Sequence, residues 1–153
     1  MLTSFVFMEF IVSKYLHKLL ASSFTLYLKT LNFHWNIEGS DFFELHELFE
    51  QQYLKLALDT DMIAEFIRTL DEKVPAGLNI FAQNSKIVDS DHNLSSNEMV
   101  NVLIQDYNQI LELIQSALQE LPESQLGIAH QLKELYANYQ KTIWMLTTWS
   151  KCK

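Results

Sequence analysis

NFHWNIEGSDFFELHELFEQQYLKLALDTDMIAE, residues 32–65, holds most of what decides the fold and the chemistry of this chain. From Asp41 to about Leu70, apolar side chains recur at steps of three and four residues, which predicts one long amphipathic helix. No Gly or Pro interrupts this pattern between Gly39 and Pro75. The expected buried stripe consists of Leu45, Leu48, Phe49, Leu56, Ile63, Phe66, Ile67 and Leu70.

Four ionisable residues lie on one face of this predicted helix. His46 and Glu50 are four residues apart, and so are Asp61 and Glu65. Because the 11 residues from Glu50 to Asp61 make almost whole turns, all four side chains fall within about 100° of arc. They border the apolar stripe, where an imidazole and three carboxylates are costly unless they are paired or bind a metal.

A single copy of the helix cannot bring both pairs to one ion, because His46 and Asp61 are roughly 22 Å apart along its axis. Other helices of the chain can supply the missing ligands in bundles that use Glu-x-x-His pairs. This chain has no such pair at His34, His46 or His130, because no Glu stands three residues before any of them. The alternative is a two-fold dimer in which the helix crosses its antiparallel copy near residues 53–54. His46 of one chain then faces Asp61 of the other, and two identical sites form.

The spacing HW-x10-H-x3-E-x10-D-x3-E, inside N-x-H-W-N-x-x-G-x-x-F-F-x-L-H-E-x-F-E, resembles the Dps mini-ferritins, which are DNA-protecting proteins of starved bacteria. KTIWML at 141–146 extends the resemblance over nearly the whole chain. It implies an all-α fold, a ferritin-like four-helix bundle forming a single domain over residues 1–153. A short extra helix is expected in the crossover between the second and third helices, over residues 78–85.

The resemblance also implies a ferroxidase site between two subunits. Carried over by position, the catalytic and metal-binding residues are His34, His46 and Glu50 from one chain, and Asp61 and Glu65 from its partner. Many relatives have Asp where this chain has Glu50. Imidazole and carboxylate ligands suit Fe²⁺, and Zn²⁺ is an expected surrogate. Trp35, next to His34, is either an aromatic that absorbs oxidising equivalents or an interface residue.

The function implied is that of an iron-storing enzyme. Fe²⁺ is oxidised to Fe³⁺, with hydrogen peroxide as the expected oxidant, and is stored as mineral inside a hollow shell. The expected shell is a dodecamer of two-fold dimers, and it protects DNA and the cell from Fenton chemistry. One departure concerns the start of the last helix, ESQLGIAHQLKE at 123–134, where relatives usually place Asp residues that line iron-conducting pores. Gln125, Leu126 and His130 stand near those positions, and Glu123 and Glu134 remain as substitutes.

Two other functions compete with the ferroxidase. The first is an architectural DNA-binding protein of the same family with little or no ferroxidase activity. We expect DNA binding to be weak, because the net charge is −8, no Lys or Arg precedes Lys14, and the C-terminus has only Lys151 and Lys153. The second is a purely structural helical bundle with an inactive site. The presence of all five predicted ligands argues against this alternative.

Composition and the remaining segments agree with a single helical domain. The 153 residues are 48% hydrophobic and include only three Gly and two Pro. The lone Cys152 excludes an intrachain disulfide and indicates a reducing, cytoplasmic location. Residues 1–12 are apolar but too short to span a membrane, and no basic residue precedes them. The other long helices are expected at about 4–34, from 93–96 to 121 with a Ser95/Glu98 capping box, and at 124–150.

Overall fold

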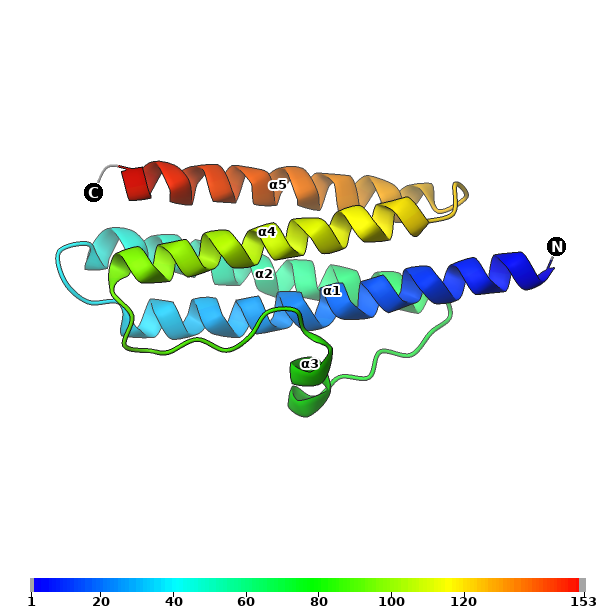
Figure 1. The fold of residues 1–153 in the computed structure, drawn as a ribbon, viewed down its shortest axis with the longest axis horizontal. Helices are drawn as coiled ribbons and strands as arrows, with labels where there is room; N and C mark the ends of the chain where they lie inside the picture. The colour runs from blue at the N-terminus through cyan, green and yellow to red at the C-terminus, as the bar shows by residue number, and fades with distance from the viewer. Residues whose placement is uncertain (1, 152–153) are drawn as a thin grey trace.

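The computed structural model describes residues 2–151, with side chains from residue 12 onward, so Cys152 lies outside the described residues. Four long helices lie side by side along the long axis, and one short helix in the crossover packs against the first of them from outside the bundle (Figure 1). These elements are α1 (Leu2–Asn36), α2 (Phe42–Thr69), α3 (Leu78–Asn84), α4 (Ser96–Glu120) and α5 (Leu126–Lys151). The described part contains no strand. The prediction of an all-α four-helix bundle with a short extra helix is therefore confirmed.

The core lies along the centre of the bundle, where α1 packs against α2 and α4, and α4 packs against α5. The rings of Phe33 and Phe49, 6.2 Å apart, join α1 to α2. Tyr107 and Tyr139, with ring centroids 5.1 Å apart, join α4 to α5. Most of the apolar stripe predicted for α2 is buried, whereas Leu28 of α1 is 40% exposed.

The helix ends show how local signals act. At the start of α4, the Ser95 hydroxyl accepts a hydrogen bond from the Glu98 amide and the Glu98 carboxylate accepts one from the Ser95 amide, so the predicted capping box is confirmed. At the start of α2, Asp41 occupies the N-cap position but makes no side-chain cap hydrogen bond. Its carboxylate instead accepts a hydrogen bond of 3.2 Å from the hydroxyl of Ser96 in α4. Asp41 therefore links the two helices.

A layer of polar side chains crosses the middle of the bundle. The Lys29 ammonium (α1) donates to the Asp106 carboxylate (α4) at 2.5 Å, and both side chains are buried. The Tyr139 hydroxyl (α5) donates to the buried Asp59 carboxylate (α2) at 3.0 Å. Lys55, one turn before Asp59, also pairs with that carboxylate. Buried polar groups must find partners, so these contacts constrain how the four long helices align.

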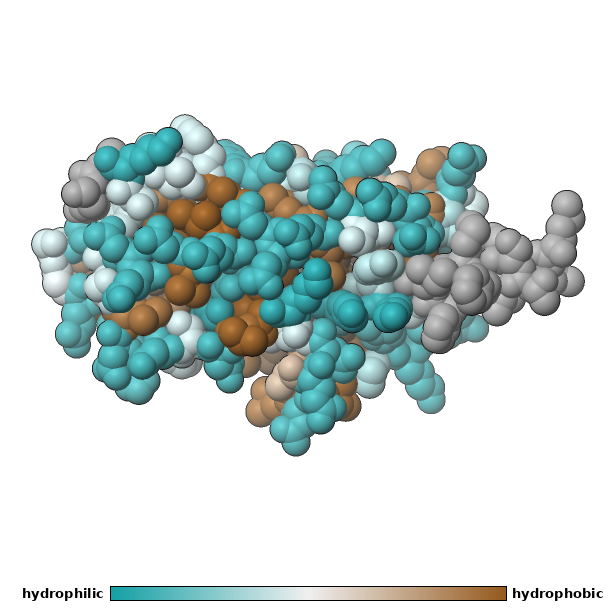
Figure 2. Space-filling view, viewed as in Figure 1, coloured by the Kyte–Doolittle hydropathy of each residue, from teal (hydrophilic) through white to brown (hydrophobic). Residues whose placement is uncertain are grey.

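The face turned towards the viewer in Figure 2 is largely hydrophilic, with hydrophobic atoms gathered along the bundle and over α3. On α3 the exposed apolar side chains include Leu78 and Ile80. No helix in the described residues is long and apolar enough to cross a membrane.

Candidate metal centre

The end of α1 and the start of α2 bring two predicted ligands together. The imidazole rings of His34 and His46 stack with their centroids 3.8 Å apart and an interplanar angle of 21°. His34 is buried, with an exposed fraction of 7%, whereas His46 is half-buried. The hairpin between the two helices, with Gly39 at φ +94°, places these residues of different helices side by side.

Reciprocal hydrogen bonds orient both rings. Nδ1 of His34 lies 2.8 Å from the carbonyl oxygen of His46, and Nδ1 of His46 lies 2.9 Å from the carbonyl oxygen of His34. A carbonyl oxygen only accepts, so each Nδ1 carries the proton and donates it. When each ring is neutral, Nε2 is the nitrogen that offers its lone pair to a metal ion. Metal-binding histidines are usually oriented by a second hydrogen bond of this kind.

Aromatic rings and one carboxylate surround the histidine pair. Phe42 stacks on His46 at 4.8 Å, and Tyr53 meets His34 edge-on at 5.2 Å. The Tyr53 hydroxyl donates to the Glu50 carboxylate at 3.4 Å. Partial desolvation, and then the charge of Glu50, raise the pKa of Tyr53 above its ordinary value. Tyr53 therefore stays protonated near neutral pH and keeps donating to Glu50.

Sequence reasoning did not assign Tyr53 or Phe42 to the site. The spacing offered a signal for each, because Tyr53 stands three residues after Glu50 and Phe42 four residues before His46. Two other aromatic residues of α2 differ in exposure: Phe49, in the predicted stripe, is fully buried, whereas Phe43 is 85% exposed. Trp35 is also exposed.

The remaining predicted ligands, Asp61 and Glu65, lie on the exposed side of α2, about four turns from His46. Among the described residues, no three His, Cys, Asp or Glu side chains come close enough to hold a metal ion. One chain thus joins two imidazoles near Glu50 at one end of α2, and two carboxylates at the other end.

Two exposed leucines occupy the stretch of α2 between these two groups. Leu54 is 54% exposed and Leu58 is 69% exposed. At about 100° per residue, both fall on the side of the helix that carries His46 and Asp61. This face of α2 therefore has an apolar centre with polar groups at both ends. Large exposed apolar side chains flanked by polar ones are typical of protein interfaces.

The centre of the bundle has a different character from this face of α2. In ferritin-like bundles with a site inside one chain, glutamates and Glu-x-x-His pairs point into the core. Here the core holds the Lys29 ammonium, which is a cation and cannot bind a metal ion. Burial raises the pKa of Asp106 although Lys29 opposes the shift, and burial followed by the nearby Asp59 raises that of Tyr139. These residues satisfy one another and leave no ligand set in the core.

The start of α5, where the sequence departs from its relatives, is largely exposed. His130 Nε2 and Glu134 Oε1 lie 3.6 Å apart, one turn from each other on the helix surface. Leu126 is 75% exposed. The substituted residues therefore stand on the surface of the chain.

Comparisons with known proteins identify the family of this chain. Residues 13–151 match the family described as Ferritin-like domain. The chain is 30% identical over 136 residues to DNA protection during starvation protein 2 of Bacillus anthracis, covering 88% of this chain and 93% of that protein. The crystal structure of a Dps protein from Bacillus brevis superposes with a TM-score of 0.89 at 28% identity, covering 93% of this chain and 96% of the other.

A Dps protein from Vibrio cholerae O1, described as a member of a broad superfamily of ferritin-like diiron-carboxylate proteins, also has a TM-score of 0.89, at 26% identity. It covers 93% of this chain and 90% of its own. The matched residues, 13–151, include all of α2, α3, α4 and α5, and α1 from Ser13 onward. The chain therefore belongs to the Dps family of mini-ferritins, within the ferritin-like superfamily.

Proposed function

We propose that this protein is a ferroxidase and iron store whose catalytic sites form between two chains. In each site, His34, His46 and Glu50 of one chain and Asp61 and Glu65 of the other bind the ferrous substrate. The observation that carries the proposal is the pair of oriented Nε2 atoms of His34 and His46, at one end of an exposed helix face. Asp61 and Glu65 stand at the other end of that face.

A two-fold dimer brings the two ends together. If α2 crosses its antiparallel copy near residues 53–54, the exposed Leu54 and Leu58 pack at the centre and His46 faces Asp61 at both edges. The polar core of the bundle supports the same arrangement, because Lys29 and its partners leave no ligand set there. We further propose that such dimers assemble into a closed, cytoplasmic dodecamer that stores the oxidised iron as mineral.

The proposed reaction takes one electron from each of two ferrous ions. One hydrogen peroxide accepts both electrons and two protons, its O–O bond breaks, and two water molecules leave. The residues bind and orient the ions: hard carboxylates and imidazoles suit Fe²⁺, and the anionic groups also stabilise the more highly charged Fe³⁺ product. Removing peroxide together with Fe²⁺ suppresses Fenton chemistry and protects DNA.

Subunit mixing tests whether the sites lie between chains. His46→Ala and Asp61→Ala should each lose most of the activity, measured by adding peroxide to anaerobically loaded Fe²⁺ and following Fe³⁺ absorbance. In a mixed dimer, one site carries both lesions and the other has none. Random mixing makes about half of the dimers mixed, so about a quarter of the parent activity should return by this two-fold counting.

A matched mixture shows whether recovery has this cause. His46 and Glu50 are assigned to the same half of each site, so every site in a mixture of His46→Ala and Glu50→Ala chains carries one lesion. That mixture should recover nothing beyond its parents. His92→Ala, in an exposed turn, should keep full activity. The absence of recovery in the first mixture, with subunit exchange verified by mass spectrometry, would show that each site is built within one chain.

A further inference from the structure

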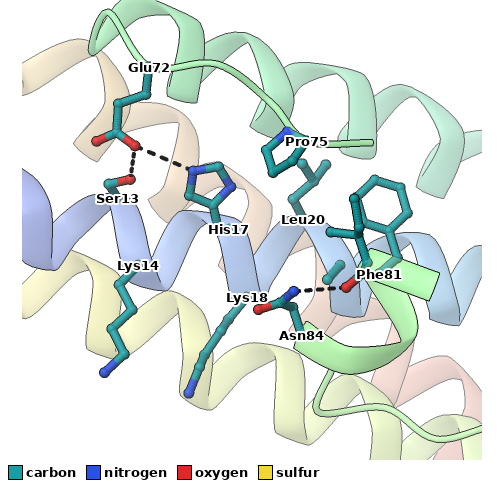
Figure 3. A pocket seen from close by; sticks show the side chains of 11 residues that line it. Ser13, Lys14, His17, Lys18, Leu20, Glu72, Pro75, Phe81 and Asn84 are labelled. Atoms are coloured by element: carbon teal, nitrogen blue, oxygen red, sulfur yellow. Dashed lines mark hydrogen bonds and ion pairs between the residues drawn. The ribbon is translucent and has the colours of Figure 1, made fainter. Parts of the chain in front are cut away.

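A cavity of about 330 Å³ lies between the first half of α1, the segment after α2, and α3 (Figure 3). Its volume is at the lower end of the range typical of small-molecule sites. None of the proposed iron ligands lines it.

One wall of the cavity holds a carboxylate whose contacts are with α1. The Ser13 hydroxyl donates to Glu72 Oε2 at 2.5 Å, and His17 Nε2 lies 3.4 Å from the same oxygen. These contacts tie the segment after α2 to α1. The Glu72 carboxylate therefore already has two partners: the Ser13 hydroxyl, which donates a hydrogen bond to it, and His17, which is a cation when protonated.

Two lysines supply the charge of the cavity. Lys14 and Lys18, one helical turn apart, both line it and point from the same side of α1, away from Glu72 (Figure 3). Among the side chains that the structure describes, neither ammonium group has a carboxylate within 4.0 Å, the ion-pair distance. By contrast, Lys29, Lys55 and Lys86 each have an acidic partner. In a chain of net charge −8, this pair is a local cationic region.

The rest of the wall is apolar. Leu20 and Ala21 of α1, Pro75, and Ile80 and Phe81 of α3 contribute carbon surface. Phe81 is held by a ring contact of 4.9 Å with Phe24, so the wall is rigid on that side. The amide nitrogen of Asn84 donates to the Ile80 carbonyl at 2.8 Å, which leaves its amide oxygen facing the cavity region (Figure 3).

We propose that this cavity binds a small organic anion with an apolar body. The carbon wall formed by Pro75, Ile80 and Phe81 takes the body, and the ammonium groups of Lys14 and Lys18 bind a carboxylate, sulfonate or phosphate head. Burial of the apolar body supplies most of the affinity, since exposed ion pairs contribute little by themselves. The two charges select an anion over a neutral molecule of the same shape.

Calorimetric titration with three matched probes tests the proposal on the intact assembled protein. Naphthalene-2-sulfonate carries both features, naphthalene-2-sulfonamide lacks the charge, and methanesulfonate lacks the apolar body. We expect one naphthalene-2-sulfonate to bind per chain. Each of the other two probes should bind at least about fivefold more weakly, because the sulfonamide loses a partly screened ion contact and methanesulfonate loses the apolar contact. Equal binding of the neutral probe, or no saturable binding, contradicts the proposal.

Variants locate the binding. Lys14→Gln with Lys18→Gln should weaken naphthalene-2-sulfonate to the level of the sulfonamide. Lys133→Gln with Lys141→Gln, an exposed pair on α5, changes the net charge equally and should leave the affinity unchanged. Ile80→Trp, at a 39% exposed position, fills the cavity and should abolish binding, with circular dichroism as the check of folding. Equal effects of the two lysine pairs, or unchanged binding in a folded Ile80→Trp variant, would overturn the assignment.

Discussion

At the scale of single residues, the same chemical group has opposite roles at different depths. Lys14 is exposed and Lys18 is half-buried, whereas Lys29 has an exposed fraction of 5% and pairs with Asp106. Burying a charge costs free energy because the charge loses its hydration. An oppositely charged partner offsets that cost, so removing either member of the pair leaves the other charge buried and uncompensated. The contact between Lys29 and Asp106 therefore specifies how α1 and α4 align more than it adds to their affinity.

Breaking this pair from one side should be strongly destabilising. Lys29→Met leaves the Asp106 carboxylate buried and unpaired, so we expect a loss of about 3–5 kcal/mol in the free energy of unfolding. Adding Asp106→Leu should recover most of the loss, because no uncompensated charge remains. Lys55→Met is the control: its side chain is half-exposed and Asp59 keeps Tyr139, so about 1 kcal/mol or less is expected. Chemical denaturation measures all three, and an equal loss for the single and double variants would contradict the account.

At the scale of elements, α4 and α5 are joined through two buried tyrosines. Burial, followed by the charges of Asp59 and Asp106, raises the pKa of Tyr107 far above its ordinary value of 10. Burial and Asp59 also raise the pKa of Tyr139. Folding thus holds the phenolic protons more tightly than the unfolded chain does, and the contribution of each tyrosine is fully present below pH 10.

Stability should therefore fall as the pH rises above about 10, because the unfolded chain releases these protons first. Each tyrosine contributes a loss of about 1.4 kcal/mol per pH unit between its unfolded and folded pKa values. Tyr107→Phe should remove the contribution of one proton to this slope of stability against pH, while the hydrogen bond from Tyr139 to Asp59 remains. Denaturation curves between pH 9 and pH 11 measure the slope, and an identical slope in the variant would show that Tyr107 does not titrate in this way.

At the scale of the whole molecule, charge and exposed apolar surface point to different partners. The net charge of −8 repels the phosphates of DNA, whereas the exposed face of α2, with Leu54 and Leu58, suits a second copy of the chain. The two facts are compatible with a protein that protects DNA chemically, by removing iron and peroxide, without coating it.

We expect DNA binding by the assembled protein to be weak at physiological salt. The described surface offers few clustered cations, and the proteins that bind DNA tightly neutralise many phosphates at once. A gel retardation assay without magnesium should show free duplex at micromolar protein. Tight binding under those conditions would contradict this expectation, and a steep loss of that binding with added salt would point to lysine contacts with phosphate.

Much of the fold could be predicted from the sequence, because its signals are local. The period of the apolar residues located all four long helices to within about two residues, and Ser95 and Glu98, three residues apart, predicted a cap that the structure contains. Periodicity reports which face of a helix is apolar but not which neighbour covers it. Leu28 follows the pattern of its helix and is nevertheless 40% exposed.

The sequence by itself therefore determined the helices and the family, since these depend on spacing along the chain, and the same spacing predicts the five ligands. Tertiary structure alone decided the contacts between residues far apart in sequence. Lys29 meets Asp106 across 77 positions, and Asp59 meets Tyr139 across 80. The hairpin after α1 likewise places Nδ1 of His34 and Nδ1 of His46 each against a carbonyl oxygen on the other helix. Such partners are chosen by packing of whole helices, and no short-range pattern encodes which helix faces lie against each other.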